Sequence, residues 1–192
     1  MHSLDAFVDL QNMRIDDAAA GTIRVATPAD AAAIASLAQR TAIDTFASQN
    51  APDDMAAFLA VSFGPEIQRR ELADPAITYL VVERAGDMIA YAMLRERSTP
   101  HVADPTALEL QRFYVDKSCH GSGIAQTLMA DCVARAAERG AGALWLGVWE
   151  RNDRALRFYT AQGFAAVGMQ TFTVGTDEQH DVVMARIIAR AV

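Results

Sequence analysis

The stretch CHGSGIAQTL, Cys119 to Leu128, places two glycines one residue apart directly before a predicted helix. Glycine costs a helix about 1 kcal/mol relative to alanine, so a pair at a helix start indicates a sharp turn or a ligand close to the backbone. The N–H groups of a first helical turn are unpaired and lie at the positive end of the helix dipole. The stretch therefore predicts an anion site, although a plain strand-to-helix turn without a ligand fits the two glycines alone equally well.

Two common phosphate-binding motifs do not match this turn. The P-loop requires Gly-x-x-x-x-Gly-Lys-Ser/Thr, which the sequence lacks. The dinucleotide-binding turn requires glycine or alanine at its third marked position, where this chain has Gln126. The glycine turn also comes late in the chain, which argues further against a Rossmann-like domain. That alternative would predict stabilisation of the protein by NAD.

Regular elements are predicted on both sides of the turn. Before it, residues 106–115 form a strand whose hydrophobic alternation is lost by Phe113, which predicts a bulge or a change of environment partway along. After it, the pattern predicts a helix over 121–139, a strand over 143–149 that is buried on both faces, and a helix that starts at Asn152 or Asp153. Two final strands follow, over 164–174 and 180–188.

The chain before residue 106 adds one strand, three helical segments and a hairpin. A strand over 22–26 precedes a helix with Thr27 as N-cap and Pro28 at its first position. Further helical segments cover about 52–62 and 65–73. Two strands then surround a turn at 85–87. This order predicts a mixed sheet with helices packed on it.

Length and composition indicate one domain. The 192 residues are 52% hydrophobic and 21% charged, which suffices for a sizeable core over residues 22–192. Residues 1–21 lack a clear period and are expected to be an N-terminal extension with a short helix over Leu4–Leu10. No apolar run reaches the roughly 18 residues that span a bilayer, and the N-terminus shows no signal-peptide pattern. We therefore expect no membrane partner.

Charge and cysteine content narrow the function further. The formal net charge is −7 and no basic stripe is present, which argues against a nucleic-acid partner and favours cationic ligands. Cys119 and Cys132 form no disulfide framework, and neither they nor the histidines have metal-ligand spacing, so we expect no metal and a cytoplasmic protein. Cys119 is adjacent to His120, but nucleophile–base pairs usually come from separate segments, so covalent catalysis is not expected.

Four motifs occur in a fixed order between Leu108 and Phe164. They are the strand end FYV, the turn HGSGIA, the apolar strand LWLGVW and the helix NDRALRFYTAQGF. This region resembles the GNAT superfamily of acyl-CoA-dependent N-acetyltransferases, with the family patterns Gln/Arg-x-x-Gly-x-Gly/Ala and Asn-x-x-Ala-x-x-Phe-Tyr-x-x-x-Gly-Phe. The resemblance implies an α/β (α+β) fold with a mixed, mostly antiparallel sheet of six to seven strands and helices on both faces. It also implies acetyl-CoA as cosubstrate. The elements over 22–97 agree in order but carry no diagnostic residues.

The resemblance assigns contacts to coenzyme A. Backbone amides of the turn would hold the pyrophosphate, and the end of strand 106–115 would pair with the pantetheine arm. Asn152 matches a position that contacts this arm, although it also fits an ordinary N-cap. His120 replaces the family's Gln or Arg, and because histidine titrates near neutrality this predicts weaker or pH-sensitive binding. The cofactor-binding candidates are Phe113, Tyr114, Val115, His120, Gly121, Ser122, Gly123, Ile124, Ala125, Gln126 and Asn152.

Acetyl transfer requires a neutral amine, a polarised carbonyl and a stabilised leaving thiolate. Tyr159 matches the family's tyrosine, the proton donor to the departing sulfur, with a core aromatic as the alternative. The Val115 amide is the candidate for polarising the carbonyl. Glu109 matches a glutamate that is the general base in some relatives, and a carboxylate that only binds the substrate's positive charge fits equally well. Glu150 is a lesser candidate that also fits a surface residue.

The acceptor is a small-molecule amine by the same resemblance. The tail TFTVGTDEQHDVVMARII resembles a subgroup that includes bacterial spermidine/spermine N-acetyltransferases, which favours a polyamine. An antibiotic, another small amine or a protein amine remains the alternative, as does a sensor that binds acyl-CoA without turnover. The acceptor site is expected from residues 41–73 and 97–106. Relatives are often dimers, which allows a homodimer. The matching tail residues are Phe172, Gly175, Gln179, Asp181 and Met184.

Overall fold

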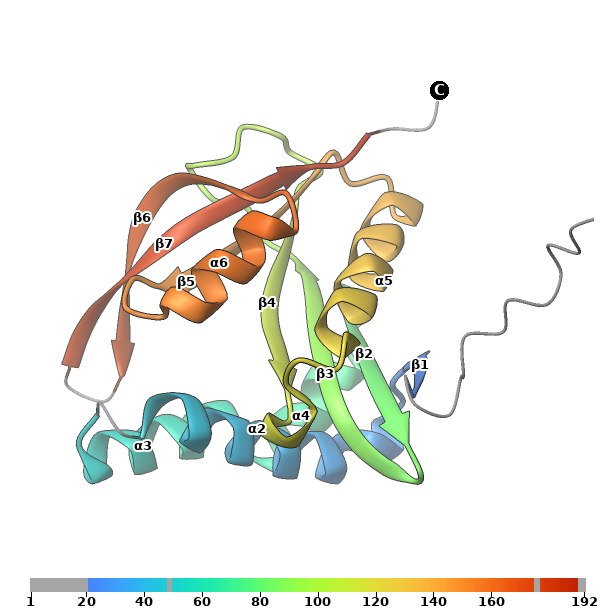
Figure 1. Cartoon of the computed structure of the whole chain (residues 1–192), viewed down its shortest axis with the longest axis vertical. Coiled ribbons are helices and arrows are strands. Elements are labelled where there is room, and N and C mark those ends of the chain that lie inside the picture. Colours follow the sequence, from blue (N-terminus) through green and yellow to red (C-terminus); the bar gives the residue numbers. More distant parts are fainter. Residues whose placement is uncertain (1–20, 48–49, 175–176, 190–192) are drawn as a thin grey trace, which may run out of the picture.

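The computed structural model describes residues 21–47, 50–174 and 177–189, and of Phe172–Val174 and Asp177 it describes the backbone alone. Within these residues one sheet has the strand order β1-β2-β3-β4-β5-β7-β6 (Figure 1). Neighbouring strands are antiparallel except β4 and β5, which are parallel. This confirms the predicted mixed, mostly antiparallel sheet. The strands are β1 (Thr22–Val25), β2 (Ile77–Arg84), β3 (Asp87–Glu96), β4 (Leu108–Val115), β5 (Ala143–Trp149), β6 (Ala165–Val174) and β7 (Asp177–Ile187).

Helices cover both faces of the sheet. One face carries α5 (Ile124–Glu138) and α6 (Asp153–Ala161), which lie next to each other in Figure 1 and share a core with β2 to β5. The other face carries α2 (Ala31–Phe46), α3 (Pro52–Ser62) and α4 (Pro65–Leu72), which pack on a second core. The observed helix starts lie within three residues of the predicted ones. Capping residues and glycines mark helix ends only to within a few residues. The predicted extension with its helix over Leu4–Leu10 lies outside the described residues.

Local chemistry explains where several elements begin. The Thr27 amide donates to Asp30 Oδ2 at 2.7 Å, and the predicted helix starts there as the short 3-10 helix η1 (Pro28–Asp30) before α2. Ala85 and Gly86 form the tight turn between β2 and β3 with φ of 53° and 88°, the left-handed conformation that two-residue hairpin turns need. Such short-range signals are present in the sequence itself, which is why these boundaries could be predicted.

The parallel pair β4–β5 separates after its first residues. Only Leu108–Leu144 and Glu109–Trp145 pair in register, among the residues that the structure describes. On the other side of β4, the register with β3 shifts so that Gln111 is an extra residue between Leu110 and Arg112. This confirms the predicted bulge in strand 106–115. A bulge bends its strand, so β4 turns away from β5 and leaves a split in the sheet.

Candidate active site

A cavity of about 360 Å³ lies at the split between β4 and β5. Successive side chains of a strand point to opposite faces of the sheet. Phe113, Val115 and Val148 belong to the α5/α6 face, whereas Tyr114 and Trp149 belong to the α2 face. All five line the cavity. A cavity lined from both faces passes through the sheet, so two molecules can reach one point from opposite sides.

The glycine turn borders the cavity on the α5/α6 face. Gly121 and Gly123 have φ of +79° and +87°, and a Cβ added to either would meet nothing within 4 Å. The glycines are therefore required by backbone conformation, and the space above them is open. The first helical hydrogen bond of α5 runs from the Thr127 amide to the Gly123 carbonyl, 3.1 Å. Residues 124–126 thus form a first turn whose amides have no partner within the helix.

Three of the predicted cofactor contacts cannot be made by side chains on this face. Ser122 Oγ donates to the Cys119 carbonyl at 2.6 Å. Ile124 is 3% exposed and lies in the core under α5. The Tyr114 ring stacks on Tyr91 on the opposite face, with ring centroids 5.5 Å apart. Ser122 and Ile124 are not among the described residues that line the cavity, and Tyr114 lines it from the α2 face.

The end of β4 presents its backbone to the split. The Asp116 amide donates to the Ile89 carbonyl of β3 at 2.8 Å, so residue 116 faces β3. Backbone groups of alternate residues point to opposite edges of a strand, so Phe113 and Val115 face the split. The Val115 carbonyl accordingly accepts a hydrogen bond from His120 Nε2 at 3.1 Å, across this edge. A pantetheine arm in the split would meet these backbone groups.

His120 also contacts α6. Its Nδ1 lies 2.7 Å from Nη1 of Arg154, so the imidazole joins the end of β4 to the start of α6. Lys117 lines the same end of the cavity. The glycine-turn end is thus basic, which suits a phosphate-bearing ligand.

Tyr159 lies on α6 and lines the cavity, with 9% of its surface exposed. Its ring meets that of Phe113 edge-on, with centroids 6.3 Å apart. Burial raises the pKa of the Tyr159 phenol above its ordinary value, and nearby Tyr114 and Cys132 raise it further. The phenol therefore keeps its proton at neutral pH and can donate it inside the cavity.

Asn152 is the N-cap of α6 and also lines the cavity. Its Oδ1 accepts from the Ala155 amide at 3.1 Å. The cap uses the carbonyl oxygen, so the Nδ2 amide is the group with which Asn152 could contact a ligand. Both roles considered for this residue are compatible in one side chain.

The position of Glu109 argues against the catalytic role predicted for it. Its side chain is 4% exposed and is not among the described residues that line the cavity. Oε2 accepts from Arg95 Nε at 2.5 Å, and Oε1 accepts from Arg97 Nη1 at 3.2 Å. Glu109 precedes the bulge, where β4 and β5 are still paired, and there its carboxylate neutralises two arginines. It is not placed to take a proton from an amine in the cavity.

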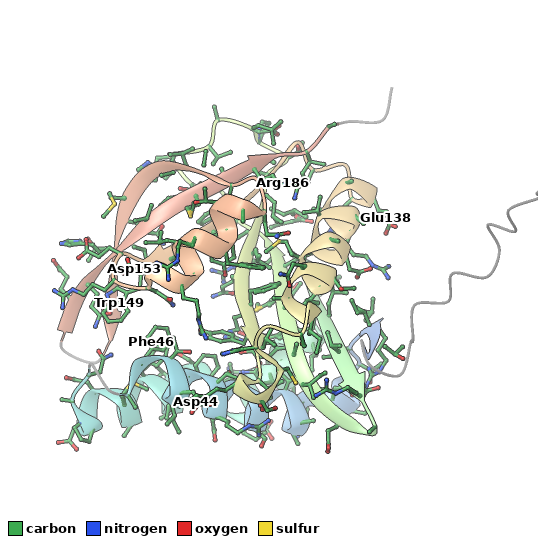
Figure 2. All side chains as sticks on the ribbon, viewed as in Figure 1. Asp44, Phe46, Glu138, Trp149, Asp153 and Arg186 are labelled. Carbon is green, nitrogen blue, oxygen red and sulfur yellow. The ribbon has the colours of Figure 1, made fainter. Side chains whose placement is uncertain are left out.

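The opposite end of the cavity is aromatic and acidic. Figure 2 shows Phe46 of α2 facing Trp149 at the end of β5, and their ring centroids are 6.2 Å apart. Asp44 lines this end too and has no ion pair within the described part of the chain. Asp181 of β7 lies behind Gly147, since a Cβ built on Gly147 would be 2.9 Å from Asp181 Oδ2. A cationic amine fits these surroundings.

Of the two segments predicted for the acceptor site, only 41–73 contributes to the cavity among the described residues. Thr41, Asp44, Thr45 and Phe46 come from the predicted segment 41–73. The predicted loop 97–106 contributes no residue to the cavity among those described. It packs elsewhere on the sheet: a Cβ on Gly168 of β6 would lie 2.1 Å from His101 Nδ1. The glycine makes room for this loop on the far side of β5.

Arg154 and Gln111 are among the cavity residues that the sequence analysis missed. Arg154 follows the Asn152 cap by two positions, and a basic residue in the first turn of that helix is the signal that could have indicated it. Gln111 is the bulge residue itself, and its buried Oε1 has no hydrogen-bond partner within the described residues. Nothing in the sequence marks which residue of β4 forms the bulge.

Within the described residues, no helix has both the length and the hydrophobicity to cross a bilayer. No group of three or more His, Cys, Asp or Glu side chains there could hold a metal ion.

Comparisons with known proteins identify the family of this chain. The model of the acetyltransferase (GNAT) family matches residues 41–164. An N-acetyltransferase of Mycobacterium tuberculosis, itself uncharacterised, is 34% identical over 157 residues, 82% of this chain and 97% of the relative. The PaiA N-acetyltransferase of Thermoplasma acidophilum, solved with coenzyme A, has the same fold, with a TM-score of 0.71 and 17% identity over 86% of this chain and 98% of that one.

A second solved structure has higher identity. The ribosomal-protein-alanine N-acetyltransferase of Brucella melitensis is 25% identical, with a TM-score of 0.68 over 86% of this chain and 99% of that one. The family match, the relatives and the split sheet lead to one conclusion. The chain belongs to the GNAT acetyltransferase family and is an acyl-CoA-dependent N-acetyltransferase with acetyl-CoA as its cosubstrate.

Proposed function

We propose that the protein transfers the acetyl group directly to a primary amine while both substrates occupy the split. The observation that carries this proposal is the cavity through the sheet, basic at one end and acidic and aromatic at the other. Coenzyme A carries phosphates and an amine substrate carries positive charge, so the two ends attract different molecules. We also propose that residues 22–192 act as one domain with 1–21 as an extension, because the described elements all join or cover one sheet.

At the basic end, the amides of residues 121–126 would bind the pyrophosphate. The open space above Gly121 and Gly123 and the first turn of α5 support this assignment. Phe113 and Val115 would pair with the pantetheine arm through their backbone, and Asn152 Nδ2 would add a further donor. These contacts would hold the thioester in the split beside the end of β4.

At the centre, the amine nitrogen would attack the thioester carbonyl, forming the C–N bond as the C–S bond breaks. The Val115 amide faces the split and would donate to the carbonyl oxygen, where negative charge develops. Tyr159 would give its phenolic proton to the leaving sulfur. After the attack the amine nitrogen carries one proton too many, and this proton would pass to Tyr159 and restore the phenol. The protonated state of Tyr159, which burial favours, supports this role.

The attacking amine must first lose a proton. Glu109 is bound by two arginines outside the cavity, so we assign it no part in this step. An aliphatic ammonium has a pKa of about 10, and a fraction of the amine is neutral near pH 8. We propose that this neutral fraction reacts, so that the rate follows the ionisation of the amine.

We propose a polyamine as the acceptor. The sequence tail supports this, and two of its matching residues lie near the acidic end: Asp181 behind Gly147, and Gln179, whose Nε2 donates to Asn50 Oδ1 at 2.8 Å. Phe172 and Gly175 of the same match lie outside the described side chains. The rings of Phe46 and Trp149 with Asp44 nearby would attract the second ammonium of a polyamine.

A protein N-terminus is the second candidate. It is favoured by the Brucella melitensis structure, whose name gives ribosomal-protein alanine as the substrate. A panel of acceptors separates the candidates: spermidine, a monoamine of similar length, and an alanine-led peptide, each with acetyl-CoA near pH 8. A higher kcat/KM for spermidine than for the monoamine supports the polyamine. Preference for the peptide refutes the polyamine. If none of the tested amines causes thiol release, the protein is better explained as a sensor that binds acyl-CoA without turnover.

A further inference from the structure

The His120 bridge is defined by two hydrogen bonds of one imidazole. Nε2 lies 3.1 Å from the Val115 carbonyl at the end of β4, and Nδ1 lies 2.7 Å from Nη1 of Arg154 on α6. Residues 120 and 154 are 34 positions apart, so the bridge exists only in the folded chain. It crosses the basic end of the cavity, which all three residues line.

The two partners fix the state of the imidazole. A carbonyl oxygen can only accept a hydrogen bond, and a guanidinium can only donate. His120 must therefore carry its proton on Nε2 and accept at Nδ1, which is the neutral form. Arg154 donates to a neutral group and has no carboxylate partner in the described part of the chain. Its positive charge is uncompensated beside the glycine turn.

Both ends of the bridge are groups that coenzyme A would use, if the proposed function holds. The Val115 carbonyl is an acceptor that we assign to the pantetheine arm. The Arg154 guanidinium contacts His120, which directly precedes Gly121. It therefore lies beside the amides assigned to the pyrophosphate. A carbonyl oxygen can accept two hydrogen bonds, but the imidazole takes the direction that faces the split. The arm would therefore compete with the ring for this position.

We propose that Arg154 is a phosphate-binding residue for coenzyme A, and that His120 holds it at the turn until the ligand takes its place. On binding, the pantetheine arm replaces His120 at the Val115 carbonyl. Arg154 then exchanges a neutral imidazole for a phosphate oxygen, a stronger charge-assisted partner. His120 is a positioning residue in this exchange, and this is why histidine can stand where the family has Gln or Arg.

The ligand's phosphates give the proposal a direct test. Coenzyme A carries a pyrophosphate and a 3′-phosphate, dephospho-CoA carries only the pyrophosphate, and pantetheine carries neither. Because Arg154 lies at the glycine turn, the proposal assigns it to the pyrophosphate. Binding is measured by calorimetry for the first two ligands and by NMR titration for pantetheine. The matched control is Arg157→Ala, since Arg157 is exposed on the same helix and does not line the cavity.

Arg154→Ala should weaken coenzyme A and dephospho-CoA by the same factor, about ten- to hundredfold, the range of a lost charge-assisted hydrogen bond. It should leave pantetheine unchanged, and Arg157→Ala should leave all three within about twofold. A loss confined to coenzyme A would place Arg154 on the 3′-phosphate and overturn the assignment to the pyrophosphate. An unchanged affinity for both phosphate ligands would overturn the proposal as a whole.

His120→Ala tests the exchange at β4. With the Val115 carbonyl released beforehand, pantetheine should bind about three- to tenfold more tightly than to the wild type. Weaker or equal binding would show that His120 does not compete with the arm. Nitrogen chemical shifts of His120 provide a second readout. In the free protein they should show a proton on Nε2 and a hydrogen bond accepted by Nδ1, and this Nδ1 hydrogen bond should be lost when dephospho-CoA binds. Wild-type protein that binds no coenzyme A at all would refute the proposed function itself.

Discussion

Replacing Glu109 by glutamine separates a structural carboxylate from a catalytic one. The side chain keeps its shape and one acceptor oxygen but loses the charge that faces Arg95 and Arg97. The glutamine oxygen still accepts from the charged Arg95, so the contact loses only part of the about 1.5–3 kcal/mol of a charge-assisted hydrogen bond, about 1 kcal/mol. Arg97 has 53% of its side chain exposed, and solvent screening keeps its share below about 1 kcal/mol.

The sum is a destabilisation of about 1–2 kcal/mol, which lowers Tm by about 2–8 °C for a chain of this size. The catalytic assay is thiol release from acetyl-CoA with spermidine between pH 7 and 9, at a temperature where both proteins are folded. We expect kcat/KM within about threefold of the wild type and an unchanged slope against pH. Glu138→Gln, at an exposed position outside the cavity lining, is the charge-matched control. A loss of about a hundredfold with a flattened slope would make Glu109 the general base after all.

Further changes test the other roles. Tyr159→Phe should lower kcat about 10²- to 10⁴-fold and leave the affinity for coenzyme A unchanged, because only a proton donor is removed; wild-type kcat would refute that role. Gly123→Ala has room for its Cβ but strains a residue at φ +87°, so it should cost roughly 1–2 kcal/mol in thermal unfolding and weaken coenzyme A in calorimetry. Arg112→Met should destabilise by about 3–5 kcal/mol, because it leaves the partly buried Glu71 without its cation; urea unfolding measures this, and a loss under 1 kcal/mol would show the pair to be dispensable. The rate of the wild type should rise about tenfold per pH unit from 7 to 9 as the amine loses its proton. Burial raises the pKa of Tyr159, so the donor stays protonated across this range, and a fall in rate above pH 8 would contradict its assignment.

The parts of the fold that could be predicted are those with short-range signals. The glycine turn before α5, the Asn152 cap of α6 and the bulge in β4 each depend on a few neighbouring residues. The motif order then led to the family and, with it, to the sheet. In the same way the sequence placed Tyr159 and the end of β4 at the site, where both line the cavity.

Long-range pairing accounts for what could not be predicted. Glu109 has the residue type of a base, but its partners Arg95 and Arg97 lie 14 and 12 positions away and meet it only when β3 pairs with β4. The contact of His120 with Arg154 likewise depends on how α6 packs beside the turn. The loop 97–106 was expected at the acceptor site, but Gly168 on β6 accommodates it elsewhere.

Direct transfer in the split is the central claim, and the mass of the protein together with thiol release tests it most directly. The protein is first incubated with acetyl-CoA alone, and spermidine is then added near pH 8. The account predicts an unmodified protein mass and little thiol before the amine, followed by steady release and acetylated spermidine after it. An acetylated protein before the amine is added, with the group on Cys119, would contradict direct transfer and replace it with a covalent intermediate.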